Sequence, residues 1–161
     1  YFKVAKNTER PFVVTAGELD VLVTGTTFGV RAYKDEKDIQ TTLESGHVTV
    51  QVEGKSVKLI PNKQALFDKL TMGLEVRDVD VDLYLAWADG RLVYDNCPLE
   101  KILSDLGRWY NINVFYNRDE LRSYQFSLNM KKHEEFTHVL ELIGKTGEVQ
   151  FEIKDNTVIV K

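Results

Sequence analysis

The chain has 161 residues, 43% hydrophobic and 11% aromatic, which is enough apolar material for one domain or two small ones. Its 21 basic and 25 acidic residues give a net charge of -4 and are scattered along the chain, which excludes a basic patch for nucleic acid. A single cysteine, Cys97, excludes an intramolecular disulfide, and no apolar run approaches the roughly 20 residues that span a bilayer.

Residues 1–84 predict an all-β domain. Short alternating segments are separated by turn residues; in residues 47–60, for example, Val48, Val50 and Val52 share one face of a strand that ends in a Glu53-Gly54-Lys55 hairpin turn. Turn signals recur about every 8 to 12 residues, which is typical of a sandwich, a barrel or a short solenoid. The fold class of this half is therefore all-β, solenoid- or sandwich-like.

Three carboxylates alternate with apolar residues where this half ends: Asp78, Asp80 and Asp82. A calcium loop would require a glycine turn and a distal glutamate, and both are missing from this pattern. The alternation predicts a strand with one wet and one buried face, with a short helix leading into Trp87 as the alternative. We expect Trp87 to be largely buried near the domain junction.

Residues 85–161 predict a small α+β domain with two β-α-β units. Leu99, Ile102, Leu103 and Leu106 have helical spacing after Pro98, a residue that suits a helix start. A second pattern starts 37 residues after Leu99, with the apolar positions Phe136, Val139, Leu140 and Ile143. Each helix has one apolar stripe, so we expect both helices to cover one face of a single small mixed sheet.

Motifs for catalysis, metal or cofactor binding are weak. The "GTTFG" segment lacks the Lys-Ser/Thr pair and the helix of a phosphate loop. In "HEEFTH", His133 and His138 are five residues apart, about 140° around a helix, so they cannot share a metal ion from one face. The sequence predicts neither an enzyme nor a metal site, and no cofactor or small-molecule substrate.

Four segments of the first half, in order and spacing, resemble the periplasmic FecR domain of anti-sigma regulators: "RPFVV" (residues 10–14), "VLVTGTTFGVRAY" (21–33), "TLESGHVTV" (42–50) and "LIPNKQA" (59–65). Residues 87–116, "WADGRLVYDNCPLEKILSDLGRWYNINVFY", resemble the C-terminal domain that follows it in many members, a relative of the secretin/TonB N-terminal (STN) fold. The resemblance divides the chain into a FecR-like domain (1–84) and an STN-like domain (85–161).

This resemblance implies the periplasmic sensor portion of a transmembrane regulator of cell-surface signalling. Its partner would be the N-terminal signalling domain of a TonB-dependent outer-membrane transporter. The signal would pass inward to an extracytoplasmic-function sigma factor, held by a cytoplasmic region that, like the membrane helix, is not in this chain. The chain is also expected to begin part way into the FecR domain, so its first domain would be N-terminally incomplete.

In some relatives the chain is cut at a comparable Gly-Thr step. Attack of the Thr26 hydroxyl on the Gly25 carbonyl would make this chain a self-processing envelope protein. The simpler interpretation, which we favour, is a β-bulge, because glycine accepts backbone conformations that are closed to other residues. A third hypothesis is a carbohydrate-binding domain that uses the aromatic residues Trp87, Tyr94, Trp109, Tyr110, Phe115 and Tyr116.

Two strands of the second half are candidate docking edges. "SYQFSLNM" alternates apolar and polar residues, and "TVIVK" is a short β-branched strand. We expect one of them to lie at a sheet edge, where its backbone accepts a strand from the partner. The predicted partner-binding residues are Tyr124, Phe126, Ser127, Leu128, Val158 and Ile159.

Overall fold

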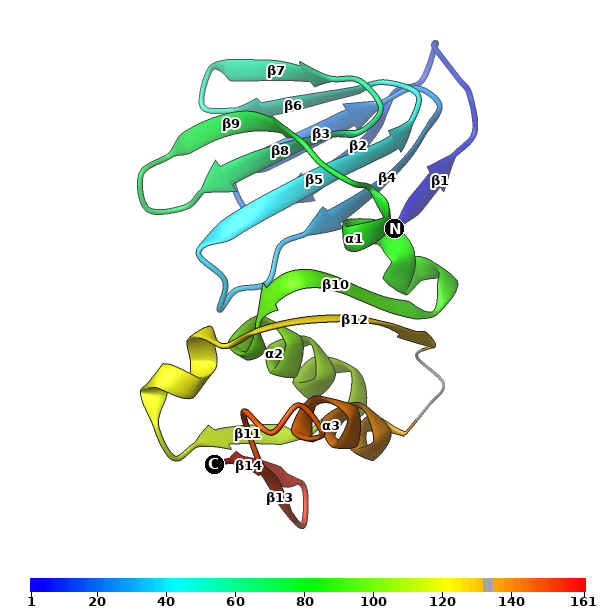
Figure 1. Ribbon diagram of the computed structural model, residues 1–161. Helices are drawn as coiled ribbons and strands as arrows, with labels where there is room; N and C mark the ends of the chain where they lie inside the picture. Colours follow the sequence, from blue (N-terminus) through cyan, green and yellow to red (C-terminus); the bar gives the residue numbers. More distant parts are fainter. Residues whose placement is uncertain (132–134) are drawn as a thin grey trace. The chain divides into compact units, whose positions relative to one another are not determined.

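The computed structural model describes residues 1–131 and 135–161 (Figure 1). The chain divides into two compact units, Tyr1–Asp89 and Gly90–Lys161. Over the described residues, no helix combines the length and the apolarity needed to cross a bilayer. His133 of the histidine pair lies outside the described residues, whereas His138 belongs to a helix of the second unit.

The first unit contains two antiparallel sheets, with strand orders β1-β4-β5-β8-β9 and β2-β3-β6-β7. The five-stranded sheet consists of β1 (Phe2–Val4), β4 (Thr26–Arg31), β5 (Asp38–Ser45), β8 (Lys63–Asp68) and β9 (Gly73–Asp78). The four-stranded sheet consists of β2 (Phe12–Ala16), β3 (Leu19–Val23), β6 (Val48–Val52) and β7 (Lys55–Leu59). Two short helices end the unit, namely α1 (Asp82–Leu85) and the 3₁₀ helix η1 (Ala86–Asp89).

The core of this unit lies between its two sheets. Val21 and Val50 from one sheet, and Phe28 and Leu43 from the other, are completely buried in one cluster. Strand alternation places such residues on the inner faces, so the unit is a β-sandwich. The predicted β6–β7 hairpin forms as well, with positive φ angles at Glu53 and Gly54, as a two-residue primed turn requires.

The segment after β9 corrects two predictions. The strand ends at Asp78, and the carboxylate of Asp80 accepts a hydrogen bond from the Asp82 N–H at 3.0 Å as α1 begins. The alternative of a short helix is therefore confirmed, and the strand interpretation is wrong beyond Asp78. Trp87 is 38% exposed rather than buried, because its ring meets the Tyr1 ring edge-on, with 6.4 Å between centroids, at the surface.

The second unit contains two separate small sheets. One pairs β10 (Arg91–Pro98) with β12 (Gln125–Lys131), and the other has the order β11-β14-β13. The strands of the latter sheet are β11 (Asn113–Tyr116), β13 (Phe151–Lys154) and β14 (Thr157–Val160). The helices are α2 (Leu99–Tyr110), the 3₁₀ helix η2 (Asp119–Ser123) and α3 (Phe136–Gly144).

The prediction of one mixed sheet with both helices on one face is wrong. Instead, α2 and α3 lie between the two sheets (Figure 1), and one cluster joins Leu103 of α2 to Phe126 of β12 and Val158 of β14. The first strands of the two predicted units pair with each other, and β11 runs parallel to β14. Local periodicity identified the helices correctly, but it does not encode which strands become neighbours.

Candidate functional site

The Gly25–Thr26 step lies where three segments of the first unit meet. Thr26 begins β4, is 4% exposed, and donates its hydroxyl hydrogen bond to the backbone oxygen of His47 at 2.8 Å. Gly25 has a φ of +144°, and a Cβ placed on it would lie 2.7 Å from the Lys6 Cα. A Cβ on Gly46, where φ is +89°, would lie 2.6 Å from the Gly25 oxygen. The step is therefore closely packed and requires glycine on both sides.

This geometry favours a structural role for Thr26. An acyl shift needs a group that removes the hydroxyl proton, and the Thr26 proton is directed at a backbone carbonyl, which is a very weak base. The bulge that we predicted at Gly25 lies elsewhere: Thr27 pairs with Ser45 and Phe28 with Leu43, which leaves Glu44 of β5 as the extra residue. The glycine thus serves the close approach of chain segments rather than a bulge of its own strand.

We expect the purified chain to keep its Gly25–Thr26 bond. Mass spectrometry under denaturing conditions should give one species near 18.5 kDa, because the buried Thr26 hydroxyl is already committed to the His47 carbonyl. Denaturation is essential, since the two fragments of a cleaved chain would stay associated through the sheets. A pair of fragments ending at Gly25 and beginning at Thr26, absent from a Thr26→Ala control, would establish self-processing.

The β12 strand presents an edge. Among the described residues, β12 pairs only with β10. The Leu99 N–H donates to the Tyr124 oxygen at 2.7 Å, so by strand alternation the backbone groups of Phe126 also face β10, while those of Ser127 and Asn129 face away. These outward-facing N–H and C=O groups can accept a further strand.

The side chains along β12 correct part of the predicted set. Phe126 is 7% exposed and packs in the core, Leu128 is half-buried against it, and Tyr124 precedes the strand as the last residue of the η2 turn. These apolar side chains therefore face inward and cannot select a docked strand. The exposed side chains at this edge belong instead to Gln125, Ser127 and Asn129.

Ser127 spans an irregularity in the β10–β12 pair. Tyr94 pairs with Leu128 and Cys97 with Phe126, so Asp95 and Asn96 together lie opposite Ser127. The Ser127 hydroxyl accepts a hydrogen bond from the Asn96 N–H at 2.8 Å and donates one to the Asp95 carboxylate at 3.1 Å. Asn96 has a φ of +43°, a value that Asn tolerates well. The Asp-Asn pair within "RLVYDNCP" was the sequence signal for this bulge.

The predicted edge at β14 is wrong. This strand lies between β11 and β13, where Val158 pairs with Val114 on one side and with Ile153 on the other. Val158 is completely buried, and Ile159 is flanked by Phe115 and Glu152. A central strand has no free backbone groups for a partner, so Val158 and Ile159 do not form a docking edge.

The aromatic residues do not form one platform. Tyr94, Trp109, Tyr110 and Tyr116 all pack against the core of the second unit, whereas Phe115 is 60% exposed on β11. Burial raises the pKa of Tyr116 to about 12, and the Arg122 guanidinium lies 4.1 Å from its ring centroid. The packed positions of most of these rings indicate a structural role.

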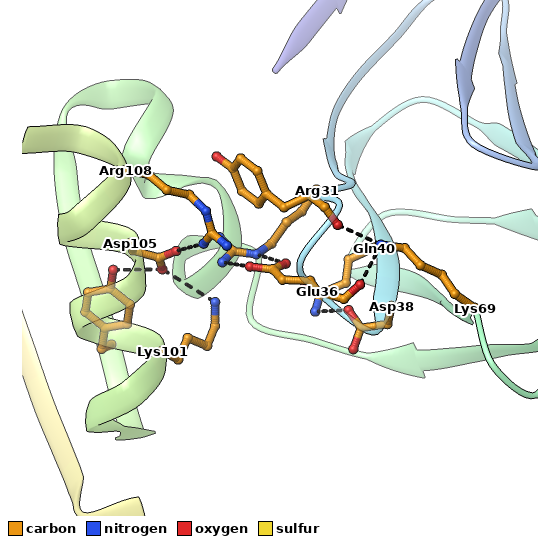
Figure 2. A network of polar contacts seen from close by, with 10 residues as sticks. Arg31, Glu36, Asp38, Gln40, Lys69, Lys101, Asp105 and Arg108 are labelled. Atoms are coloured by element: carbon orange, nitrogen blue, oxygen red, sulfur yellow. Dashed lines mark hydrogen bonds and ion pairs between the residues drawn. The ribbon is translucent and has the colours of Figure 1, made fainter. Parts of the chain in front are cut away.

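Each unit also contains a local polar network (Figure 2). In α2, Asp105 is 4% exposed and accepts a hydrogen bond from the Tyr94 hydroxyl at 3.0 Å; Lys101 and Arg108 lie 3.5 and 3.4 Å from its oxygens. In the first unit, Arg31 forms a two-fold ion pair with Glu36 across the β4–β5 loop. Charge-assisted hydrogen bonds of this kind fix local geometry. Within the described residues, no three potential ligands gather as a metal site.

Two structures of one protein share this fold. That protein, described as a candidate anti-sigma factor from Parabacteroides distasonis ATCC 8503, was crystallised at 1.65 and 2.50 Å resolution. The TM-scores are 0.85 and 0.84, with 21% sequence identity in both cases. The matches cover 99% and 98% of this chain and 74% of the other protein. No curated protein sequence matches the chain.

Two family models match the sequence, and they match different units. Residues 1–49 match the model described as FecR protein, and residues 91–160 match the model described as FecR, C-terminal. The first match lies in the β-sandwich, and the second spans nearly the whole unit built on β10–β14. The two regions of one family therefore occur in order along the chain, which belongs to the FecR family.

Proposed function

We propose that this chain is the periplasmic sensor portion of a FecR-type anti-sigma regulator. It would relay a signal from the N-terminal domain of a TonB-dependent outer-membrane transporter to an extracytoplasmic-function sigma factor. The observation that carries the proposal is the pair of family matches, one on each unit. The fold likeness to a candidate anti-sigma factor supports it.

The second unit would receive the partner at the open edge of β12. The transporter domain, which the family resemblance describes as a similar small β-α-β fold, would add one of its strands there. Backbone hydrogen bonds from residues such as Ser127 and Asn129 would supply affinity. The exposed polar side chains of the same edge, rather than buried Phe126, would supply selectivity. The unit would thus act as a binding module rather than as an enzyme or an STN-type channel component.

An affinity capture tests the proposal. The full chain, immobilised and exposed to a Gram-negative envelope extract, should retain one transporter through its N-terminal signalling domain, as identified by mass spectrometry. The same experiment with isolated residues 1–89 serves as the control for the first unit. Recovery of unrelated soluble enzymes alone would contradict the proposed relay.

We expect Asn129→Pro to weaken binding of the recovered domain at least tenfold. Proline removes the N–H that points to the open edge, and the N–H groups that pair with β10 are left in place. Isothermal titration calorimetry measures the affinity, and circular dichroism checks the fold. Asn129→Ala is the matched control because it keeps the backbone donor, and it should bind like the unaltered chain.

Two other positions are less suitable for this test. Ser127→Pro would also remove the hydroxyl that bridges Asp95 and Asn96, and Ile159→Pro would break the centre of the three-stranded sheet. Unchanged affinity in a folded Asn129→Pro chain would exclude strand addition at β12. The helical face or the β-sandwich would then be the docking surface.

A further inference from the structure

The last eight residues of the first unit, α1 (Asp82–Leu85) and η1 (Ala86–Asp89), form a segment that we call the linker segment. It contacts the outer face of the five-stranded sheet. The strand registers place one residue from each of four strands in a row on that face, namely Gly29, Thr42, Gln64 and Arg77. Their neighbours Phe28, Leu43 and Ala65 point into the sandwich core, so the row points away from it.

Leu85 of the linker segment occupies the space above Gly29. A Cβ built on Gly29 would overlap the Leu85 Cδ2 atom, and Leu85 itself is only 6% exposed. Gly29 does not have a positive φ, so glycine is required at this position for space and not for conformation. Any larger residue at position 29 must displace the leucine. We call this contact the glycine notch.

The rest of the row forms its own hydrogen bonds. The Arg77 guanidinium donates to the Gln64 side-chain oxygen at 2.6 and 2.9 Å, and Gln64 donates to the Thr42 hydroxyl at 2.7 Å. The linker segment adds one longer bond, from Arg77 to the Tyr84 hydroxyl at 3.3 Å. If the segment left, these polar side chains would remain paired with one another. Only the glycine notch would lose an apolar contact.

The linker segment is too short to remain helical on its own. A four-residue α-helix followed by a four-residue 3₁₀ helix lies far below the length at which isolated helices persist in water. Val81, the residue that precedes α1, provides no side-chain cap. Its helical form therefore depends on docking to the sheet, and an undocked segment becomes extended chain.

We propose that the linker segment is a releasable latch, held to the sandwich by Leu85 in the glycine notch. Docked, it belongs to the first unit and keeps the tether to β10 short. Released, its eight residues become a flexible tether that reaches up to about 28 Å at roughly 3.5 Å per residue. A partner that binds better to the released state would shift the chain toward it. The latch is a property of this chain and holds whatever that partner is.

Hydrogen exchange on the full chain tests the latch. The amides of Leu83, Tyr84 and Leu85 donate to backbone oxygens of Asp80 and Val81, so they report whether α1 is formed. In Gly29→Val these amides should exchange at least tenfold faster, while the α2 amides are unchanged. Thr27→Val, on the same face of the same strand, is the matched control and should exchange like the unaltered chain.

Two further measurements complete the test. Leu85→Ala should speed the same amides and remains decisive if Gly29→Val fails to fold; the pair Gly29→Ala and Leu85→Ala should be non-additive, because both act on one contact. Small-angle X-ray scattering should show a larger radius of gyration in either released variant. Unchanged exchange in folded Leu85→Ala, fully additive effects, or faster exchange with no change in radius of gyration would each overturn the latch.

Discussion

Leu103→Ala should lower the free energy of unfolding of the second unit by about 2 to 5 kcal/mol, the usual cost of deleting a buried leucine side chain. Leu103 is completely buried in the middle of α2, within the cluster that joins both small sheets. Leu140 of α3 is 2% exposed in the same cluster and should behave alike. A unit of 72 residues has little stability to spare, so its melting transition should fall far below that of the sandwich.

The matched control is Leu142→Ala. Leu142 lies on the same helix as Leu140 but is 43% exposed, so its loss should change stability by no more than about 0.5 kcal/mol. Calorimetry with residue-resolved NMR would follow the two units separately. We propose that they are independent domains, and loss of both units in one transition would contradict that division.

The helices of the second unit could be predicted because their signal is local. All eight apolar positions assigned to the two helical stripes lie on the helices, and those in α2 (Leu99, Ile102, Leu103 and Leu106) are completely buried. Spacing of 3.6 residues depends only on the neighbouring turns. Strand pairing depends on distant segments instead, and for that reason the sequence misplaced β14 at an edge and merged two sheets into one.

The candidate sites show the same limit. The edge at β12 could be predicted from alternation, but which face of the strand is buried depends on α2 and α3. Gly29, inside the strand-like "TTFGVR", was a signal of close approach that the sequence analysis did not use. Its partner Leu85 lies more than fifty residues away, and nothing local links the two. The domain boundary expected at residues 84 and 85 would divide the linker segment, which packs with the first unit.

Gly46→Ala should destabilise the sandwich by more than Gly54→Ala, although both glycines have positive φ angles, +89° and +76°. The positive φ alone should cost about 1 to 2 kcal/mol for an L side chain. A Cβ on Gly54 meets nothing within 4 Å, whereas a Cβ on Gly46 would lie 2.6 Å from the Gly25 oxygen. That overlap should add about 1 to 3 kcal/mol, as forced overpacking does.

Urea unfolding of the two single variants measures the difference, since they match in residue change and in backbone conformation. The comparison isolates the contact between the β5–β6 turn and the Gly25–Thr26 step. A Gly46→Ala chain that gives way at this contact should also lose the Thr26 hydrogen bond to His47, because Gly46 precedes that carbonyl and a Cβ there would lie 3.0 Å from the Thr26 hydroxyl. Equal losses in the two variants would show that the turn moves aside freely, and close packing would then no longer explain why this step requires glycine.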